Sequence, residues 1–289
     1  MKTCGFTIVR NAVKFNYPVI ESIRSILPLV DRFYVSIGNS EDATRELIES
    51  ISSDKIKILH SIWDDSLRKG GKVLADETNK VIDQIPADYE WLFYLQADEV
   101  IHENDLPEIQ KGMEAYLTNP AVEGLLLHYN HFYGTYDYIG DSRTWYRYEV
   151  RIIRNDKRIR SFRDAQGFRK DGKKLHVKML EASVYHYGWV KDPKIMAEKM
   201  NHFRKMYHSD DWVKKNYITP ELFDFSEVDS VKRFESTHPE VMKERIARVE
   251  WKVNIDPGRK NFKLKDRFLY WVEKETGKRL FEYRNYTLI

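Results

Sequence analysis

Five apolar residues run directly into an amide and two carboxylates in the stretch WLFYLQADE, residues 91–99. Carboxylate oxygens are ligands that Mg²⁺ and Mn²⁺ prefer, and such an ion can neutralise charge that builds on a diphosphate leaving group. Side chains of successive strand residues point to opposite faces, so we expect only one of Asp98 and Glu99 to face a ligand. From position alone, an acidic turn in solvent explains the pair about as well.

Two further stretches carry groups that could hold a nucleotide. In GNSEDAT, residues 38–44, Asn39 and Asp42 could contact a base or a ribose, although helix capping alone also explains them. In KGGKVLADETN, residues 69–79, the glycines and Lys72 could approach a phosphate near a helix N-terminus. Neither the Walker spacing nor the dinucleotide G-x-G-x-x-G spacing occurs there, so kinase and dehydrogenase functions lose their main support.

Four residues of the second half are also candidates. Asp164 and Glu149 are carboxylates with arginines close by in sequence, so a salt bridge is the simpler explanation for both. A neighbouring guanidinium should lower the pKa of Glu149. His186, in VYHYGWV, is of a type that is more often a hydrogen-bonded structural residue than a ligand. Trp189 could belong to the core or offer a stacking surface to a sugar.

The elements that must position these residues alternate between strand and helix. Strand-like runs occupy residues 4–11, 32–37, 55–62 and 91–96, and helical stripes occupy residues 17–30, 45–52 and 70–85. This alternation predicts an α/β fold with a mostly parallel sheet that is flanked by helices. Ligands bind outside the carboxyl ends of such strands, which is where QADE lies.

The remaining chain changes character twice. Residues 104–190 contain strand-like pieces with basic and aromatic residues between them and no strong helical period, whereas the chain from Pro193 onward looks mostly helical. We therefore expect a catalytic domain over residues 1–190, divided into a donor half (1–103) and an acceptor half (104–190). Residues 191–289 are expected to form a helical C-terminal extension.

Composition narrows the class of partner and the compartment. Lys and Arg number 48 and Asp and Glu 45, a net charge of +3 spread along the chain, which argues against a nucleic-acid partner. The one cysteine, Cys4, excludes an intrachain disulfide and suits a reducing compartment. No signal peptide and no apolar stretch of about 20 residues is evident, so a cytoplasmic protein is expected.

Taken in order, five motifs resemble those of the family 2 glycosyltransferases with the glycosyltransferase-A fold. They are FTIVRN (first strand), GNSEDAT (Asp-x-Ser-x-Asp-x-Thr turn), KGGKVLADETN (Gly-to-Asn helix entry), FYLQADE (Leu-Asp-Ala-Asp metal motif) and HYGWV (late His-containing motif). The resemblance covers roughly residues 5–200. It implies transfer of a sugar, with inversion, from a nucleoside-diphosphate donor to a hydroxyl of a glycan or lipid-linked acceptor, assisted by Mn²⁺ or Mg²⁺.

The resemblance also implies roles for single residues. Asp98 and His186 would hold the metal, and Asp164, or second to it Glu149, would be the general base on the acceptor side. Trp189 is expected at the acceptor. The residues expected to bind the donor are Arg10, Asn11, Asn39, Asp42, Lys72 and Gln96.

One departure from the family pattern keeps a second hypothesis open. Gln96 stands where the family has the first Asp of its metal motif, and an amide can bond a ribose hydroxyl but brings no charge. The alternative is a catalytically silent relative that binds a nucleotide or a glycan. A sugar-phosphate nucleotidyltransferase is disfavoured, because VRNAVKF lacks the Gly-rich loop that this chemistry needs after the first strand.

The C-terminal segment, residues 258–289, mixes basic and aromatic residues. Peripheral contact with the anionic inner face of a membrane would explain this composition and would place the enzyme near a lipid-linked acceptor. A helix packed on the domain or on a partner subunit explains it as well.

Overall fold

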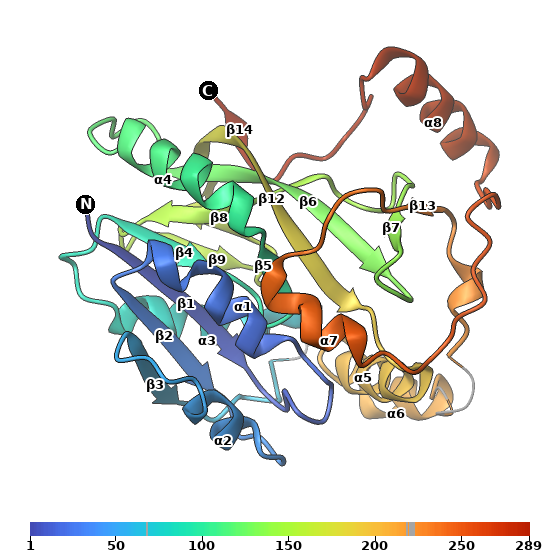
Figure 1. Cartoon of the computed structure of the whole chain (residues 1–289), viewed down its shortest axis with the longest axis horizontal. Helices are drawn as coiled ribbons and strands as arrows, with labels where there is room; N and C mark the ends of the chain where they lie inside the picture. Colours follow the sequence, from blue (N-terminus) through green and yellow to red (C-terminus); the bar gives the residue numbers. More distant parts are fainter. Residues whose placement is uncertain (68, 218, 220–222) are drawn as a thin grey trace.

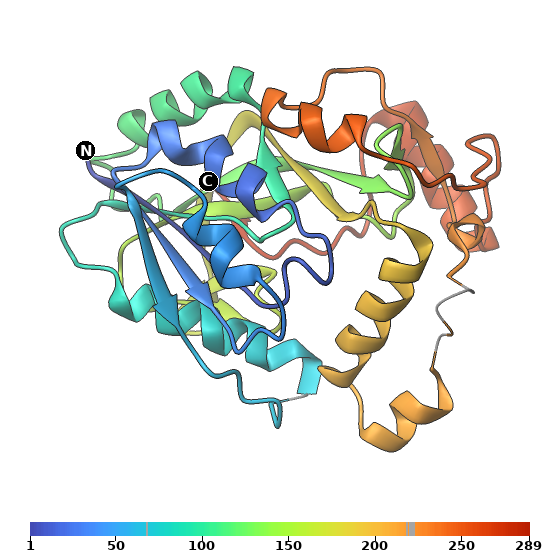
Figure 2. The ribbon, with the colours of Figure 1, turned by 60° about the horizontal axis from the view of Figure 1, so that its bottom comes forward.

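The computed structural model describes residues 1–67, 69–217, 219 and 223–289 (Figure 1). Eleven strands of these residues pair in one mixed sheet, in the order β13-β7-β6-β8-β4-β1-β2-β3, with β12 beside β5, β6 and β14. Helices cover both faces of the sheet, as the two views show (Figures 1 and 2). The α/β class with a central sheet flanked by helices, predicted from the sequence, is therefore confirmed.

The first hundred residues form the parallel part of this sheet. Its strands are β1 (Thr3–Val9), β2 (Arg32–Ile37), β3 (Ile56–His60) and β4 (Trp91–Tyr94). The helices between them are α1 (Val19–Ile26), α2 (Thr44–Glu49) and α3 (Lys72–Gln84). All neighbouring pairs in the order β3-β2-β1-β4 are parallel, so β1 and β4 end at the same edge. The predicted alternation of strand and helix is confirmed here.

The middle of the chain adds strands of both directions. They are β5 (Glu99–Ile101), β6 (Gly124–Tyr133), β7 (Tyr138–Gly140), β8 (Tyr148–Arg154) and β12 (His176–Trp189). β8 is antiparallel to β4 and β6, whereas β12 is parallel to β6 and antiparallel to β5. A separate small sheet contains β9 (Ile159–Phe162), β10 (Gly167–Lys170) and β11 (Lys173–Lys174).

This middle region also contains a helix that the sequence pattern does not predict. α4 (Leu106–Ala115) has Pro107 in its first turn and buries Ile109 and Met113, which are one helical turn apart. The helix is short, and its apolar stripe is interrupted by charged residues, so its period is weak in the sequence.

The last hundred residues contain helices and two short strands that return to the sheet. The helices are α5 (Pro193–Lys205), α6 (Asp210–Lys215), α7 (Lys243–Ala247) and α8 (Leu264–Thr276). The strands are β13 (Val231–Arg233) and β14 (Thr287–Leu288). Single 3₁₀ turns occur at η1 (Leu27–Leu29), η2 (Lys69–Gly71), η3 (Glu103–Asp105), η5 (Phe225–Glu227) and η6 (Glu240–Met242). Within the described ranges, none of these helices combines the length and hydrophobicity that a bilayer crossing requires.

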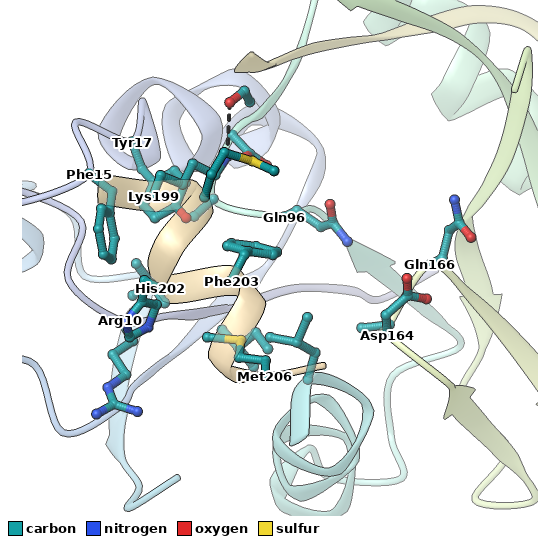
Figure 3. A pocket seen from close by; sticks show the side chains of 18 of the residues that line it. Arg10, Phe15, Tyr17, Gln96, Asp164, Gln166, Lys199, His202, Phe203 and Met206 are labelled. Atoms are coloured by element: carbon teal, nitrogen blue, oxygen red, sulfur yellow. Dashed lines mark hydrogen bonds and ion pairs between the residues drawn. The ribbon is translucent and has the colours of Figure 1, made fainter. Parts of the chain in front are cut away.

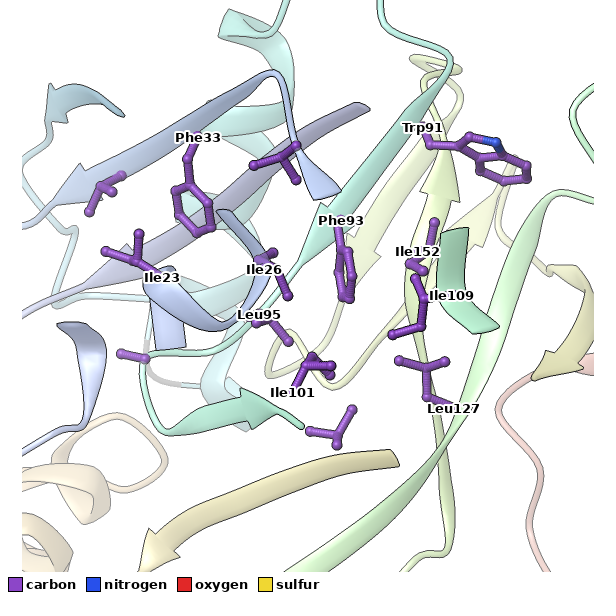
Figure 4. Close-up of a cluster of buried hydrophobic side chains, with 14 of the residues drawn as sticks. Ile23, Ile26, Phe33, Trp91, Phe93, Leu95, Ile101, Ile109, Leu127 and Ile152 are labelled. Carbon is purple, nitrogen blue, oxygen red and sulfur yellow. The ribbon is translucent and has the colours of Figure 1, made fainter. Parts of the chain in front are cut away.

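Two hydrophobic clusters lie on the two faces of the sheet. In β4, Trp91 and Phe93 point into the cluster under α1 and α4, whereas Leu92 and Tyr94 point into the cluster under α3. Figure 4 shows the first cluster, in which Phe93 lies between the apolar residues of α1 and those of α4. Burial of both faces explains why β4 is a continuous apolar run. The first polar residue after β4 is Gln96, at the edge of the sheet.

Candidate functional site

A cavity of about 450 Å³ lies at the edge where β1 and β4 end. Its walls come from the ends of β1, β4 and β12, from the turn between β9 and β10, and from α5 (Figure 3). Of the residues singled out in the sequence, those that line it are Arg10, Gln96, Asp98, Asp164, His186 and Trp189. Residues more than a hundred positions apart therefore meet at the predicted edge of the sheet.

Asp98 contacts two basic side chains in the cavity wall. Its Oδ2 accepts a hydrogen bond from Nζ of Lys199 on α5 at 3.2 Å, and its Oδ1 lies 3.7 Å from Nε2 of His186. Asp98 and Lys199 are both only 8% exposed. A Cβ atom at Gly188 would lie 2.6 Å from Asp98 Oδ2 and 2.5 Å from His186 Nε2, so only glycine leaves room for this cluster.

Electrostatics favours the charged form of Asp98. Burial raises the pKa of this carboxyl, but the electrostatic effect of its basic neighbours, first Lys199 and then His186 and Lys191, outweighs burial and lowers the pKa to about 2. Burial lowers the pKa of His186 against the opposing effect of Asp98, which favours the neutral imidazole. Burial also lowers the pKa of Lys199 from its usual value, again opposed by Asp98.

The residues around Asp98 do not fit the divalent metal site that the family resemblance implies. Such an ion needs several oxygen or nitrogen ligands, and Lys199 places an ammonium group directly on the carboxylate. Gln96 contributes an amide where a second carboxylate would be needed. In the part of the chain that the structure describes, no three His, Cys, Asp or Glu side chains come close enough together to hold a metal ion.

Arg10 and Gln96 occupy the ends of the two central parallel strands. Arg10 pairs with Asp65 at 2.8 Å, and its buried Nε has no hydrogen-bond partner among the described residues. The Gln96 backbone is held on both sides, because its N–H donates to Glu99 and its carbonyl accepts from the Ser22 hydroxyl. The fixed backbone leaves the Gln96 amide in the cavity, where it points toward the side that carries Asp164 (Figure 3).

Asp164 lies in a strained turn between β9 and β10. The residues before and after it, Arg163 and Ala165, both have positive φ, at 57° and 59°. Side chains other than glycine rarely adopt this conformation, and such strain is typical of functional sites. The Tyr207 hydroxyl lies 3.4 Å from Asp164 Oδ2, and Gln166 follows in the cavity wall. The turn thus holds a carboxylate at the open cavity at some cost in stability.

Four of the expected donor-binding residues lie outside the cavity lining. The Asn11 side chain accepts from the backbone N–H of Glu41, and Asp42 accepts from the N–H of Thr44 at the start of α2. Asn39 accepts from the Trp63 N–H. Lys72 is exposed at the start of α3. Asp42 therefore bonds the backbone N–H groups of Thr44 and Lys14, whereas the N-cap of α2 is Ala43, which makes no side-chain capping bond.

Glu149 is buried away from the cavity lining, and its pKa moves opposite to the sequence expectation. The side chain lies on β8, 3.8 Å from Arg151, and the residue is 3% exposed. Burial raises the pKa of Glu149 to about 8 against the effect of Arg151, and the charge of Glu99 raises it further. The expected lowering of this pKa is wrong, because burial outweighs the opposing charge of Arg151.

Sequence reasoning missed the contribution of α5 to the site. Lys199 and Phe203 lie one helical turn apart on this helix and both line the cavity, as does Met206 just beyond it. Gln166, beside Asp164, also lines the cavity. The spacing 199, 203, 206 is a helical face, but an apolar face with one lysine is indistinguishable in sequence from an ordinary packing surface.

No protein-family model matches this chain, and no curated protein matches it in sequence. Several solved structures are similar to part of it. S. aureus TarS 1–349 in complex with UDP is 13% identical, with 70% of this chain and 64% of that chain covered and a TM-score of 0.37. A 4-diphosphocytidyl-2C-methyl-D-erythritol synthase from Anaerococcus prevotii is 9% identical, with 70% and 94% covered and a TM-score of 0.38. Glucosyl-3-phosphoglycerate synthase from Mycobacterium tuberculosis, crystallised with Mn²⁺, UDP and phosphoglyceric acid, is 17% identical, with 46% and 43% covered and a TM-score of 0.29. At these identities and TM-scores the similarities assign the chain neither a family nor an activity.

Proposed function

We propose that this protein is a glycosyltransferase of the glycosyltransferase-A type. It would transfer a sugar, with inversion, from a nucleoside-diphosphate donor to a hydroxyl of a glycan or lipid-linked acceptor. The observation that carries this proposal is the cavity at the ends of β1 and β4, which combines cations, amides and a solvent-facing carboxylate. Five motifs in the family order support it from the sequence.

In this proposal Asp164 is the general base. It removes the proton from the acceptor hydroxyl as the hydroxyl oxygen attacks the anomeric carbon of the donor. The bond from that carbon to the diphosphate oxygen breaks, and the electron pair leaves on the diphosphate. Asp164 is preferred over Glu149, because Asp164 lines the cavity whereas Glu149 is buried beside it and favours its protonated form at neutral pH.

The other site residues are assigned by their place in the cavity. Arg10 and Gln96 would contact the diphosphate and the ribose of the donor, and Trp189 would face the acceptor. Asn11, Asn39, Asp42 and Lys72 would support the donor indirectly, through the turns that border the site. We propose a catalytic domain over residues 1–190 and an extension over residues 191–289, in which α5 completes the cavity wall. The proposed reaction uses no Mn²⁺ or Mg²⁺ ion, although the resemblance implies one, because Lys199 bonds to Asp98.

The experiment is a donor panel. The full chain is mixed with UDP-, GDP- and dTDP-sugars, with and without oligosaccharide or polyprenyl-phosphate acceptors, and the released nucleoside diphosphate is measured. Wild type should release nucleotide from at least one donor, and Asp164→Asn should lower kcat by about 10²- to 10⁴-fold without changing donor binding. Asp171→Asn, an exposed neighbour with φ 48° on the same small sheet, is the matched control.

Two outcomes of the panel would contradict the proposal. Equal turnover by Asp164→Asn and Asp171→Asn would remove the assignment of the base. Donor binding without turnover across the panel would favour the alternative of a catalytically silent binding protein, for which Gln96 is the supporting residue.

We also propose that α8 brings the protein to the inner, cytoplasmic face of a membrane. Leu264, Phe268 and Trp271 share one face of α8 and are 84%, 60% and 58% exposed. Lys265 and Arg267 lie exposed on the same helix. An apolar face with a basic surround is typical of helices that bind anionic lipid surfaces.

A further inference from the structure

We propose that the ammonium group of Lys199 is the cation that meets the donor diphosphate, in place of a divalent metal ion. The inference rests on the proposed function. Lys199 lies outside the five sequence motifs that support that function. It assigns Lys199 a catalytic role, because its ammonium would touch the leaving group.

Lys199 is held so that part of its bonding capacity remains for a ligand. Its Nζ donates to Asp98 Oδ2 at 3.2 Å and to the Gly188 carbonyl at 2.9 Å. An ammonium group has three donors, and these two bonds leave the third for the cavity that the side chain lines. Asp98 thus orients the cation instead of holding a metal ion.

A second buried lysine, Lys191, lies near Lys199 but outside the cavity lining. The Nζ of Lys191, on a side chain with no exposed surface, donates to the Asn16 carbonyl at 3.2 Å. The Nζ atoms of Lys191 and Lys199 lie 4.6 Å and 4.9 Å from the centre of the Tyr17 ring. Burial, and then the charge of Lys199, lowers the pKa of Lys191 well below its usual value, which favours the neutral amine there. Asp98 is the one carboxylate that the described ion pairs place on Lys199. The charged groups here are thus the Lys199–Asp98 pair, and a negatively charged ligand in the cavity would meet the remaining donor of Lys199.

The chemical step balances without a metal ion. The acceptor proton goes to Asp164, the acceptor oxygen bonds to the anomeric carbon, and the electron pair of the broken bond stays on the diphosphate. Lys199 donates a charge-assisted hydrogen bond to that diphosphate as its charge grows. A fixed donor in a site shielded from water contributes most to such a step.

The first test needs no substitution. Nucleotide release by the wild-type full chain is measured with excess EDTA, with Mg²⁺ and with Mn²⁺, using the donor that the panel identifies. We expect the three rates to agree within about twofold, because the cation is part of the protein. Loss of activity in EDTA that Mn²⁺ restores would overturn the proposal.

The second test measures binding instead of turnover. Calorimetry with inorganic pyrophosphate in EDTA compares the wild type with Lys199→Met and Lys199→Arg. The control is Lys205→Met, since Lys205 is an exposed lysine at the end of α5. Lys199→Met should weaken binding by about tenfold or more and Lys199→Arg by less, whereas Lys205→Met should bind as the wild type does. Equal affinities for Lys199→Met and Lys205→Met would overturn the inference.

The two proposals fail in different ways. If no donor is bound or turned over, the proposed function fails, whatever the pyrophosphate result. If donors are turned over but metal is required, only the role of Lys199 fails. Thermal unfolding identifies variants that do not fold. If Lys199→Met does not fold, Lys199→Arg, which retains the positive charge, is compared with the wild type instead.

Discussion

Arg151 holds Glu99 with both sides of its guanidinium group: Nε lies 2.8 Å from Oε2 and Nη2 lies 2.6 Å from Oε1. Both side chains are fully buried, and the Tyr129 hydroxyl donates to the same carboxylate. The pair joins β5 to β8, and neither residue lines the cavity. The second carboxylate of QADE is therefore a structural residue, whereas the first lines the cavity.

Glu99→Gln should be strongly destabilising. The substitution leaves the Arg151 charge buried without its partner, which costs about 3–5 kcal/mol in comparable proteins. Urea unfolding of Glu99→Gln and of Glu244→Gln gives the comparison, since Glu244 is 85% exposed and its pair with Arg248 should contribute less than about 1 kcal/mol. Similar free energies of unfolding for the two variants would contradict a role for Glu99 in holding the fold.

Glu149 should make the protein less stable as the pH rises. Its pKa is about 8 in the folded chain against an ordinary value of 4.5, so between these values the folded state binds the proton that the unfolded state has lost. The free energy of unfolding must then fall as pH increases through this window, by a few kcal/mol at most. Glu149→Gln should remove this slope and be the more stable form above about pH 8. Unfolding by urea across the window measures both slopes, and parallel curves would show that Glu149 does not titrate as described.

Ala165→Gly should stabilise the fold. Ala165 has φ 59°, a conformation that glycine adopts without steric cost, so we expect a gain of about 0.5–1 kcal/mol. Ala75→Gly, within α3, should cost a similar amount, because glycine weakens a helix interior. Thermal unfolding of both variants decides the point, and destabilisation by both would remove the argument for backbone strain beside Asp164.

The exposed face of α8 predicts binding to anionic vesicles. Wild type should co-sediment with vesicles that contain phosphatidylglycerol, and less so at high salt, because basic residues surround the apolar face. Phe268→Ser combined with Trp271→Ser should abolish sedimentation. Tyr217→Ser, which removes an aromatic side chain that is 57% exposed elsewhere, serves as the control. Equal sedimentation of the two variants would point to some other surface.

The sequence predicts the parallel part of the fold because every strand in it has a simple cause. β1 and β4 are buried throughout, and β2 is buried after its first residue, so all three are mostly apolar runs that stop near where the chain emerges. The same reasoning predicts that only one of Asp98 and Glu99 faces a ligand; Asp98 alone of the two lines the cavity, and its contact with a ligand stays a prediction. The order of apolar and polar residues is sufficient to predict an element when that element's own residues show its burial.

The rest of the site depends on contacts between distant segments, which no local pattern contains. α5 carries Lys194, Lys199 and Lys205, and nothing in their spacing indicates that only Lys199 reaches Asp98. The pKa expectation for Glu149 fails for the same reason, because the sequence shows the nearby Arg151 but not the burial that raises this pKa.

The place of α5 in the cavity wall also has a consequence for the order of events during protein synthesis. Lys199 leaves the ribosome 101 residues after the carboxylate it bonds. A nascent chain that has completed β1 to β4 holds Asp98 at an open sheet edge without its cation. It acquires the completed pocket only when α5 docks. A translation product that stops before α5 would therefore carry most of the sheet but would lack the wall of the pocket that α5 supplies.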